Sequence, residues 1–200
     1  MTTLASTLLE PGHRALGAGG GCVPGDDVAA IADAVRRLLD DPPAAVPLER
    51  LAPWSRWITP RLASVSRRRF DTRFFVARAE PGQQAQHDDH EATEAVWLAP
   101  REALLRFWDG AIDLAPPQIM CLVELARQAD VASTLRLARA RGPALVLPEP
   151  YDDEGARVLC YPGDPRHSVR EAVWSGPTRL VHRNGRFEPV GGLAALLPPA

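Results

Sequence analysis

Lysine is absent from this sequence, and all 23 basic side chains among its 200 residues are arginine. The acidic residues number 25, so the formal net charge is −2. That balance gives no general attraction to nucleic acid or to an anionic membrane surface, and we expect neither as a partner. Any phosphate-binding site must be local, and arginine suits one because its guanidinium can bind two phosphate oxygens at once.

Cysteine is also scarce. Cys22, Cys121 and Cys160 are odd in number and far apart, which excludes a disulfide framework and lacks the close spacing of a zinc site. Long apolar runs are missing too. No stretch approaches the roughly 18 uninterrupted apolar residues of a membrane helix, and no basic start leads into an apolar segment. These absences predict a cytoplasmic protein.

The residues that are present suit one soluble domain with a substantial core, since 46% are hydrophobic and 24% are charged. Changes of pattern divide the chain into four predicted segments. They are an irregular start at 1–26, a main domain at 27–141, a β-rich appendage at 142–190 and a loosely held tail at 191–200.

Apolar spacing predicts both helices and strands in the main domain. The helices are expected at 28–39, from 100 to before Gly110, from 116 to about 128 and at 132–141. The strands are expected at 54–59, 70–79 and 91–98, in one antiparallel sheet. In the appendage, Asn184-Gly185 between two apolar runs predicts a two-residue hairpin, because both turn positions need a positive φ.

Four motifs follow one another in an order that is typical of a known family. They begin at Trp54, Arg69, Val96 and Leu114, and read Trp-Ser-Arg-Trp-Ile-Thr-Pro, Arg-Phe-Asp-Thr-Arg-Phe-Phe, Val-Trp-Leu-Ala-Pro and Leu-Ala-Pro-Pro-Gln. Through these motifs, residues 28–130 resemble the acyl-CoA diphosphatase branch of the Nudix hydrolase superfamily. The run Pro-Gly-Asp-Pro at 162–165 is similar to C-terminal extensions of bacterial members.

The resemblance implies an α+β fold, namely a Nudix-type α/β/α sandwich with a mixed or antiparallel sheet. Because the chain starts at Met1, we expect this sandwich to be incomplete, without the first part of the sheet. The implied activity is hydrolysis of nucleoside diphosphate derivatives, typically CoA or acyl-CoA, with Mg²⁺ or Mn²⁺ as cofactor. Such cations neutralise the pyrophosphate and lower the pKa of the attacking water.

The Nudix box, which supplies the family's metal-binding glutamates as G-x5-E-x7-R-E-U-x-E-E-x-G-U, is degenerate in this sequence. The best alignment of its end, at residues 5–13, keeps Glu10 and Gly12. Ser6 and Leu9 stand where the family has glutamates. The resemblance therefore leaves Glu10 as the candidate from the box for catalysis and metal binding.

The resemblance also implies a further carboxylate from a loop after the box. It favours Glu91, for catalysis and metal binding. Glu94 is the next candidate, as a metal ligand. Glu91 ends the run His-Asp-Asp-His-Glu, whose oxygen and imidazole groups can bind a cation. The same run fits a solvated loop, because neighbouring residues at the start of a strand point in alternating directions. Both interpretations stay open.

Two other groups of residues also have a functional and a structural interpretation. Arg67, Arg68 and Arg69 can bind the phosphate groups of a substrate, or can form an exposed basic turn. The aromatic side chains of the expected strands can stack an adenine, or can belong to the core. These aromatic residues are Trp54, Trp57, Phe74, Phe75 and Trp97.

Two functions remain open. The first is a Nudix-like hydrolase of nucleoside diphosphate derivatives, of the CoA or acyl-CoA diphosphatase type, that is weakened or inactive because its box is degenerate. The second is a non-catalytic, truncated Nudix-fold protein that acts as a nucleotide-binding or protein-interaction module. An incomplete sheet also presents an exposed edge, which favours a homodimer.

Overall fold

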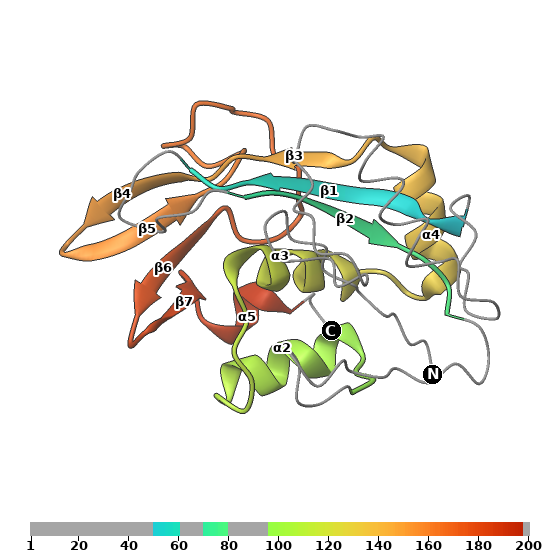
Figure 1. Ribbon diagram of the computed structural model, residues 1–200. Coiled ribbons are helices and arrows are strands. Elements are labelled where there is room, and N and C mark those ends of the chain that lie inside the picture. The colour runs from blue at the N-terminus through green and yellow to red at the C-terminus, as the bar shows by residue number, and fades with distance from the viewer. Residues whose placement is uncertain (1–49, 61–69, 80–95, 198–200) are drawn as a thin grey trace, which may run out of the picture.

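The structure is a computed structural model that describes residues 50–60, 70–79 and 96–197. These residues form two sheets and four helices, so the predicted α+β class is confirmed. In Figure 1, α3 and α2 lie below the sheet that contains β1 and β2. The bounds are β1 Ala52–Ile58, β2 Asp71–Val76, α2 Pro100–Trp108, α3 Pro116–Leu125, α4 Val131–Ala140, β3 Ala144–Val146, β4 Glu149–Asp153, β5 Ala156–Cys160, β6 Arg179–Arg183, β7 Arg186–Pro189 and α5 Leu193–Leu196.

The first sheet has the strand order β2-β1-β3. β1 and β2 are antiparallel, with a register shift between Pro53 and Ser55, whereas β3 is parallel to β1. Of the strand expected at 91–98, residues 96–98 are not strand, and 91–95 lie outside the described residues. The sheet is therefore mixed rather than purely antiparallel, because β3 comes from the segment that the sequence pattern assigns to the appendage.

Three helices confirm the predictions at 100, 116 and 132 to within a few residues. α2 and α3 begin at proline, which suits the first helical turn because an N–H there has no partner within the helix. α4 begins after Asp130, whose carboxylate accepts a hydrogen bond of 2.6 Å from the backbone N–H of Ser133. The helix expected at 28–39 lies outside the described residues. Among the described helices, none has the length and apolar character needed to cross a bilayer.

The second sheet is antiparallel and has the order β4-β5-β6-β7. Its predicted hairpin is confirmed, since Asn184 and Gly185 join β6 to β7 with φ of 49° and 83°. A second turn of this kind, at Glu154 and Gly155, joins β4 to β5 with φ of 48° and 80°. Sequence patterns did not indicate β4, because its proline and two aspartates are uncommon in strands.

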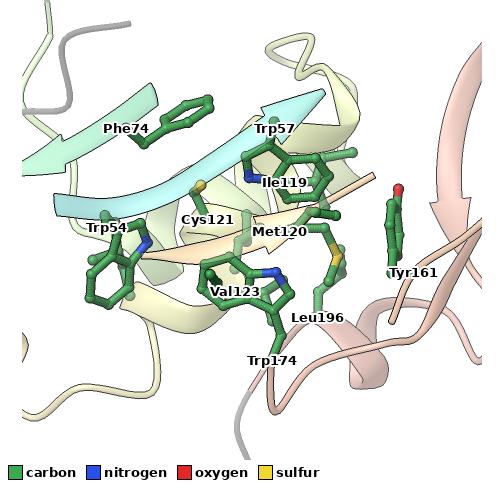
Figure 2. Close-up of a cluster of buried hydrophobic side chains, with 14 of the residues drawn as sticks. Trp54, Trp57, Phe74, Ile119, Met120, Cys121, Val123, Tyr161, Trp174 and Leu196 are labelled. Carbon is green, nitrogen blue, oxygen red and sulfur yellow. The ribbon is translucent and has the colours of Figure 1, made fainter. Parts of the chain in front are cut away.

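One hydrophobic core joins the two sheets, and Figure 2 shows side chains from both parts in one cluster. Trp57 of β1 meets Tyr161, just after β5, with ring centroids 5.6 Å apart. Arg186 of β7 donates to the carbonyl oxygens of Phe107 and Trp108, at 2.8 and 3.1 Å. A cation is favourable there because α2 ends at these carbonyls. The predicted boundary between 141 and 142 stays a prediction, but the core continues across it.

The loosely held tail expected at 191–200 is corrected for residues 191–197. This part includes α5, and the side chain of Leu196 is fully buried in the core. Leu193 and Leu197 pack against the same core. Burial of these apolar side chains holds the segment, even though its sequence has no regular period.

The inclusion of β3 in the core can be tested with two neighbouring substitutions. Val146 is fully buried, whereas Leu145 is 52% exposed. We expect Val146→Ala to lower the free energy of unfolding by about 2 kcal/mol, because it removes buried methyl groups and leaves a cavity. Leu145→Ala, the control, should cost less than about 0.5 kcal/mol. Urea denaturation measures both, and equal costs would contradict the assignment of β3 to the core.

Candidate functional site

The carboxylates and arginines proposed from the sequence lie outside the described residues. Glu10, Glu91 and Glu94 are among them, as is the arginine run at 67–69. The polar run at 87–90 falls in the same undescribed part. Their roles therefore stay predictions.

The aromatic candidates are described, and three of the five belong to the core. Trp54, Trp57 and Phe74 are 1%, 3% and 6% exposed. Phe75 and Trp97 are half-buried. The core interpretation thus holds for the first three, which belong to the cluster of buried side chains drawn in Figure 2.

Two of the family motifs are joined by an ion pair across the first sheet. Arg56 of β1 donates from Nε and Nη2 to the two carboxylate oxygens of Asp71 in β2, at 2.8 and 2.5 Å. These hydrogen bonds hold the pKa of the Asp71 carboxyl below its usual value, although partial burial opposes them. Asp71 and Arg56 therefore fix the β1–β2 pair.

The other two motifs form the starts of helices. Val96-Trp97-Leu98-Ala99 leads into α2 at Pro100, and Leu114-Ala115 leads into α3 at Pro116. The side-chain carbonyl of Gln118 accepts a hydrogen bond of 2.7 Å from the backbone N–H of Ala115, which closes the first turn of α3. The proline and glutamine of the Leu-Ala-Pro-Pro-Gln motif thus have a structural role at the start of α3.

The most extensive polar network of the described residues is centred on Asp164, in the Pro-Gly-Asp-Pro run. Asp164 is fully buried and accepts hydrogen bonds from Arg179 Nε and Nη2 at 2.7 and 2.8 Å. The hydroxyl of Thr178 and the backbone N–H of Arg166 also donate to it, at 3.0 and 2.9 Å. Gly163 has a φ of 96°, and a Cβ there would lie 2.6 Å from that of Ala172. Only glycine fits this turn.

The hydrogen-bond partners of Asp164 stabilise the ionised form of its carboxyl group. Burial alone would raise the pKa of this carboxyl, but the hydrogen bonds from Arg179, Arg166 and Thr178 outweigh burial and lower the pKa below its usual value. The carboxylate is thus a permanent anion near neutral pH, and its oxygens are occupied by donors. Its role is to anchor the connection between β5 and β6.

Both ring nitrogens of His167, three residues after Asp164, also have hydrogen-bond partners. It is 3% exposed, its Nδ1 accepts from the N–H of Val169 at 2.9 Å, and its Nε2 is 3.0 Å from the carbonyl oxygen of Leu147. These contacts assign the proton to Nε2 of a neutral ring. His167 can therefore act as a base only if the hydrogen bond from Val169 breaks.

Cysteine chemistry is also disfavoured at the two described cysteines. Cys121 and Cys160 are free and buried. Burial raises the pKa of the Cys121 thiol to about 12 and that of the Cys160 thiol to about 11. Since the thiolate is the nucleophile, neither residue suits covalent catalysis near neutral pH.

The described residues do not fit a divalent cation. Within 50–60, 70–79 and 96–197, there is no group of three or more His, Cys, Asp or Glu side chains that could hold a metal ion. The buried carboxylates of Asp164 and Glu124 hold Arg179 and Arg141 instead. The candidate cation ligands Glu10, Glu91 and Glu94 lie outside the described residues.

Sequence reasoning missed Asp164, Arg179 and Glu124 as buried polar residues. One signal was present for Glu124, since it is the charged residue of the otherwise apolar or neutral helix α3. A charge on such a helix needs a partner when it is buried. The run Pro-Gly-Asp-Pro contains Asp164, but its partner Arg179 is too distant in the sequence for a motif to include it.

Comparison with known proteins identifies the family. A family model described as the NUDT19 Nudix domain matches residues 43–127. Acyl-coenzyme A diphosphatase NUDT19 of Xenopus laevis is 35% identical over 151 residues, which are 68% of this chain and 40% of that protein. These matches support a Nudix assignment for the chain. Its resemblance to the acyl-CoA diphosphatase branch is confirmed.

Two further relatives are similar to the chain over different lengths. Acyl-coenzyme A diphosphatase NUDT19 of Gallus gallus is 40% identical over 78 residues, 38% of this chain and 20% of that protein. Putative nudix hydrolase 7 of Caenorhabditis elegans is 26% identical over 163 residues, 74% of this chain and 54% of that protein. The chain thus spans 20% to 54% of these relatives. No solved structure matches significantly.

The Nudix domain match includes β1, β2, α2 and α3. It ends before α4, β3 and the whole second sheet. The segment that follows the match nevertheless supplies the parallel strand of the first sheet and part of the core. In this chain, the matched domain and the β-rich segment are therefore packed as one unit.

The anchoring role of Asp164 leads to a pH-dependent prediction. Asp164→Asn should lower the free energy of unfolding near neutral pH by about 3 kcal/mol, because Arg179 loses its charged partner while it is largely buried. The folded-state pKa of Asp164 lies below the value of about 3.9 in an unfolded chain. The contribution is therefore present above that value and is lost as the pH falls through the folded-state pKa.

Urea denaturation near pH 7 and near pH 3 measures this difference between wild type and variant, which should shrink in acid. Asp152→Asn is the matched control, because Asp152 forms a similar pair with Arg157 but is solvent-exposed. Such surface pairs contribute little. The same loss in both variants near neutral pH would contradict the anchoring role.

Proposed function

We propose that this protein is a cytoplasmic Nudix-family hydrolase that cleaves the pyrophosphate bond of nucleoside diphosphate derivatives of the CoA or acyl-CoA type. The observation that carries the proposal is the match of residues 43–127 to the NUDT19 Nudix domain. Two relatives that bear the name acyl-coenzyme A diphosphatase support the substrate class. A pyrophosphate linked to a nucleotide is the chemistry that this class shares.

The proposed roles fall on residues that the family resemblance selects. Glu91 and Glu10 are the catalytic candidates, and Glu10, Glu91 and Glu94 are the candidate ligands of Mg²⁺ or Mn²⁺. Such a cation neutralises phosphate charge and makes a bound water more acidic. The arginine run at 67–69 is the candidate for holding the phosphate groups of the substrate, since guanidinium groups bind phosphate in a bidentate manner.

We expect slow hydrolysis of the pyrophosphate, because Ser6 and Leu9 stand at two box positions that carry glutamates in the family. Loss of cation ligands weakens the neutralisation of the pyrophosphate, and with it the reaction. The same observation favours a second candidate function, in which the protein binds a nucleotide or a partner protein without catalysis. The two functions differ in turnover, which can be measured directly.

The test is incubation of the purified protein with CoA and Mn²⁺ or Mg²⁺. Hydrolysis of the pyrophosphate releases adenosine 3′,5′-bisphosphate and 4′-phosphopantetheine, which chromatography separates from CoA. We expect slow release that depends on the added cation. Glu91→Gln should reduce the rate by about 100-fold, because it removes a carboxylate while it keeps the size of the side chain.

Glu171→Gln is the matched control, since Glu171 is exposed in the connection between β5 and β6. It should leave the rate unchanged. No release from CoA by the wild-type protein would exclude CoA hydrolysis and favour the non-catalytic function. Equal rates for wild type and Glu91→Gln would remove Glu91 from the proposed site.

A further inference from the structure

Three side chains from separate parts of the chain meet beside the first sheet. They are Trp54 of β1, Arg141 directly after α4, and Trp174 in the connection between β5 and β6. The two indole centroids are 6.1 Å apart, and Arg141 Cζ lies 4.8 Å from the ring centroid of Trp54 and 5.2 Å from that of Trp174. Figure 2 shows the two indole rings side by side. We call these three residues the Arg141 cluster.

Glu124 of α3 supplies the negative charge next to the Arg141 cluster. Its Oε1 lies 3.5 Å from Arg141 Nη1, and its Oε2 accepts from the backbone N–H of Ser175 at 3.3 Å. Glu124 thus engages one end of the guanidinium. The indole faces of Trp54 and Trp174 stabilise the positive charge from the sides.

The remaining donors of the Arg141 cluster have no acceptor. Among the residues that the structure describes, Nε and Nη2 of Arg141 and the indole nitrogens of Trp54 and Trp174 are buried without a hydrogen bond. An indole N–H lies in the plane of its ring, so the guanidinium stacked above that ring cannot satisfy it. All four groups only donate, and buried donors without a partner are rare in proteins.

We propose that the Arg141 cluster binds an oxyanion, in the form of a phosphate or carboxylate group. Its oxygens accept hydrogen bonds from Nε and Nη2 of Arg141, and from the indole N–H of Trp54. In Figure 2 the nitrogen of Trp54 lies on the side of its ring that faces Trp174. Two donors on one edge of a guanidinium match the spacing of two oxygens on such an anion, while Glu124 keeps the other end.

The anion reaches this site by displacement of Trp174. The side chain of Arg141 is 26% exposed, whereas its Nε and Nη2 atoms are buried. Trp174 belongs to the connection at 161–178, which contains neither helix nor strand. Long connections of this kind commonly cover binding sites. Near Trp174, the connection contacts α3 through the hydrogen bond of 3.3 Å from the backbone N–H of Ser175 to Glu124 and through the close approach of Gly176 to Val123.

This site is independent of the proposed hydrolase function, because none of the candidate catalytic or metal-binding residues takes part in it. Calorimetric titration of the wild-type protein with inorganic phosphate, and separately with acetate, at constant ionic strength tests it. We expect saturable binding of at least one of the two anions. Binding of phosphate alone assigns a phosphate ligand, and binding of acetate alone assigns a carboxylate.

Three variants locate the site. Arg141→Gln should abolish binding, and Trp54→Phe, which keeps an aromatic ring but removes the N–H, should weaken it about tenfold. Arg127→Gln is the matched control, since Arg127 lies just after α3 and donates to the carbonyl of Val123. It should bind as the wild type does.

The proposal is overturned if neither anion gives a saturable heat, or if Arg141→Gln binds as tightly as the wild type. Circular dichroism checks that each variant is folded. If Arg141→Gln fails to fold, Trp54→Phe decides the matter, because undiminished binding by that variant also overturns the proposed contacts.

Discussion

The parallel pairing of β3 with β1 is the contact on which the rest of the described structure depends. Parallel neighbours need a long crossover, and here it contains β2, α2, α3 and α4. β1 is the central strand of this sheet, and its side chains Trp54 and Trp57 are buried in the core. The same pairing fixes where the chain enters the second sheet, so that Tyr161 reaches Trp57 and Trp174 reaches Trp54.

Sequence patterns predicted the elements whose formation depends on nearby residues. Proline at the starts of α2 and α3 and Asn184-Gly185 in the β6–β7 turn act within a few residues, and these predictions are confirmed. β4 pairs locally with β5 across a two-residue turn but has a composition that is uncommon in strands, whereas β3 pairs with a strand far away in the sequence. Such strands depend on tertiary contacts, which local propensity does not report.

In the candidate site, too, features made by adjacent residues could be predicted, whereas contacts between distant segments could not. The family motifs could be recognised because their residues are adjacent, and the structure explains Arg56 and Asp71 by the ion pair between β1 and β2. The partners of Asp164 and Glu124 could not be predicted, because burial and pairing of a charge are decided by segments that meet only in the folded chain. The residues proposed for catalysis lie outside the described part, so their prediction rests on the resemblance alone.

Arginine pairing limits what the described carboxylates can do. Asp71, Glu124, Asp164 and Glu188 each contact an arginine side chain. Guanidinium groups are weakly hydrated and bind carboxylates through several N–H donors, so they suit partly buried pairs better than lysine would. A divalent cation would have to displace an arginine to use any of these oxygens. These four carboxylates therefore serve the fold, and a cation in the proposed hydrolysis depends on glutamates that are free of such pairs.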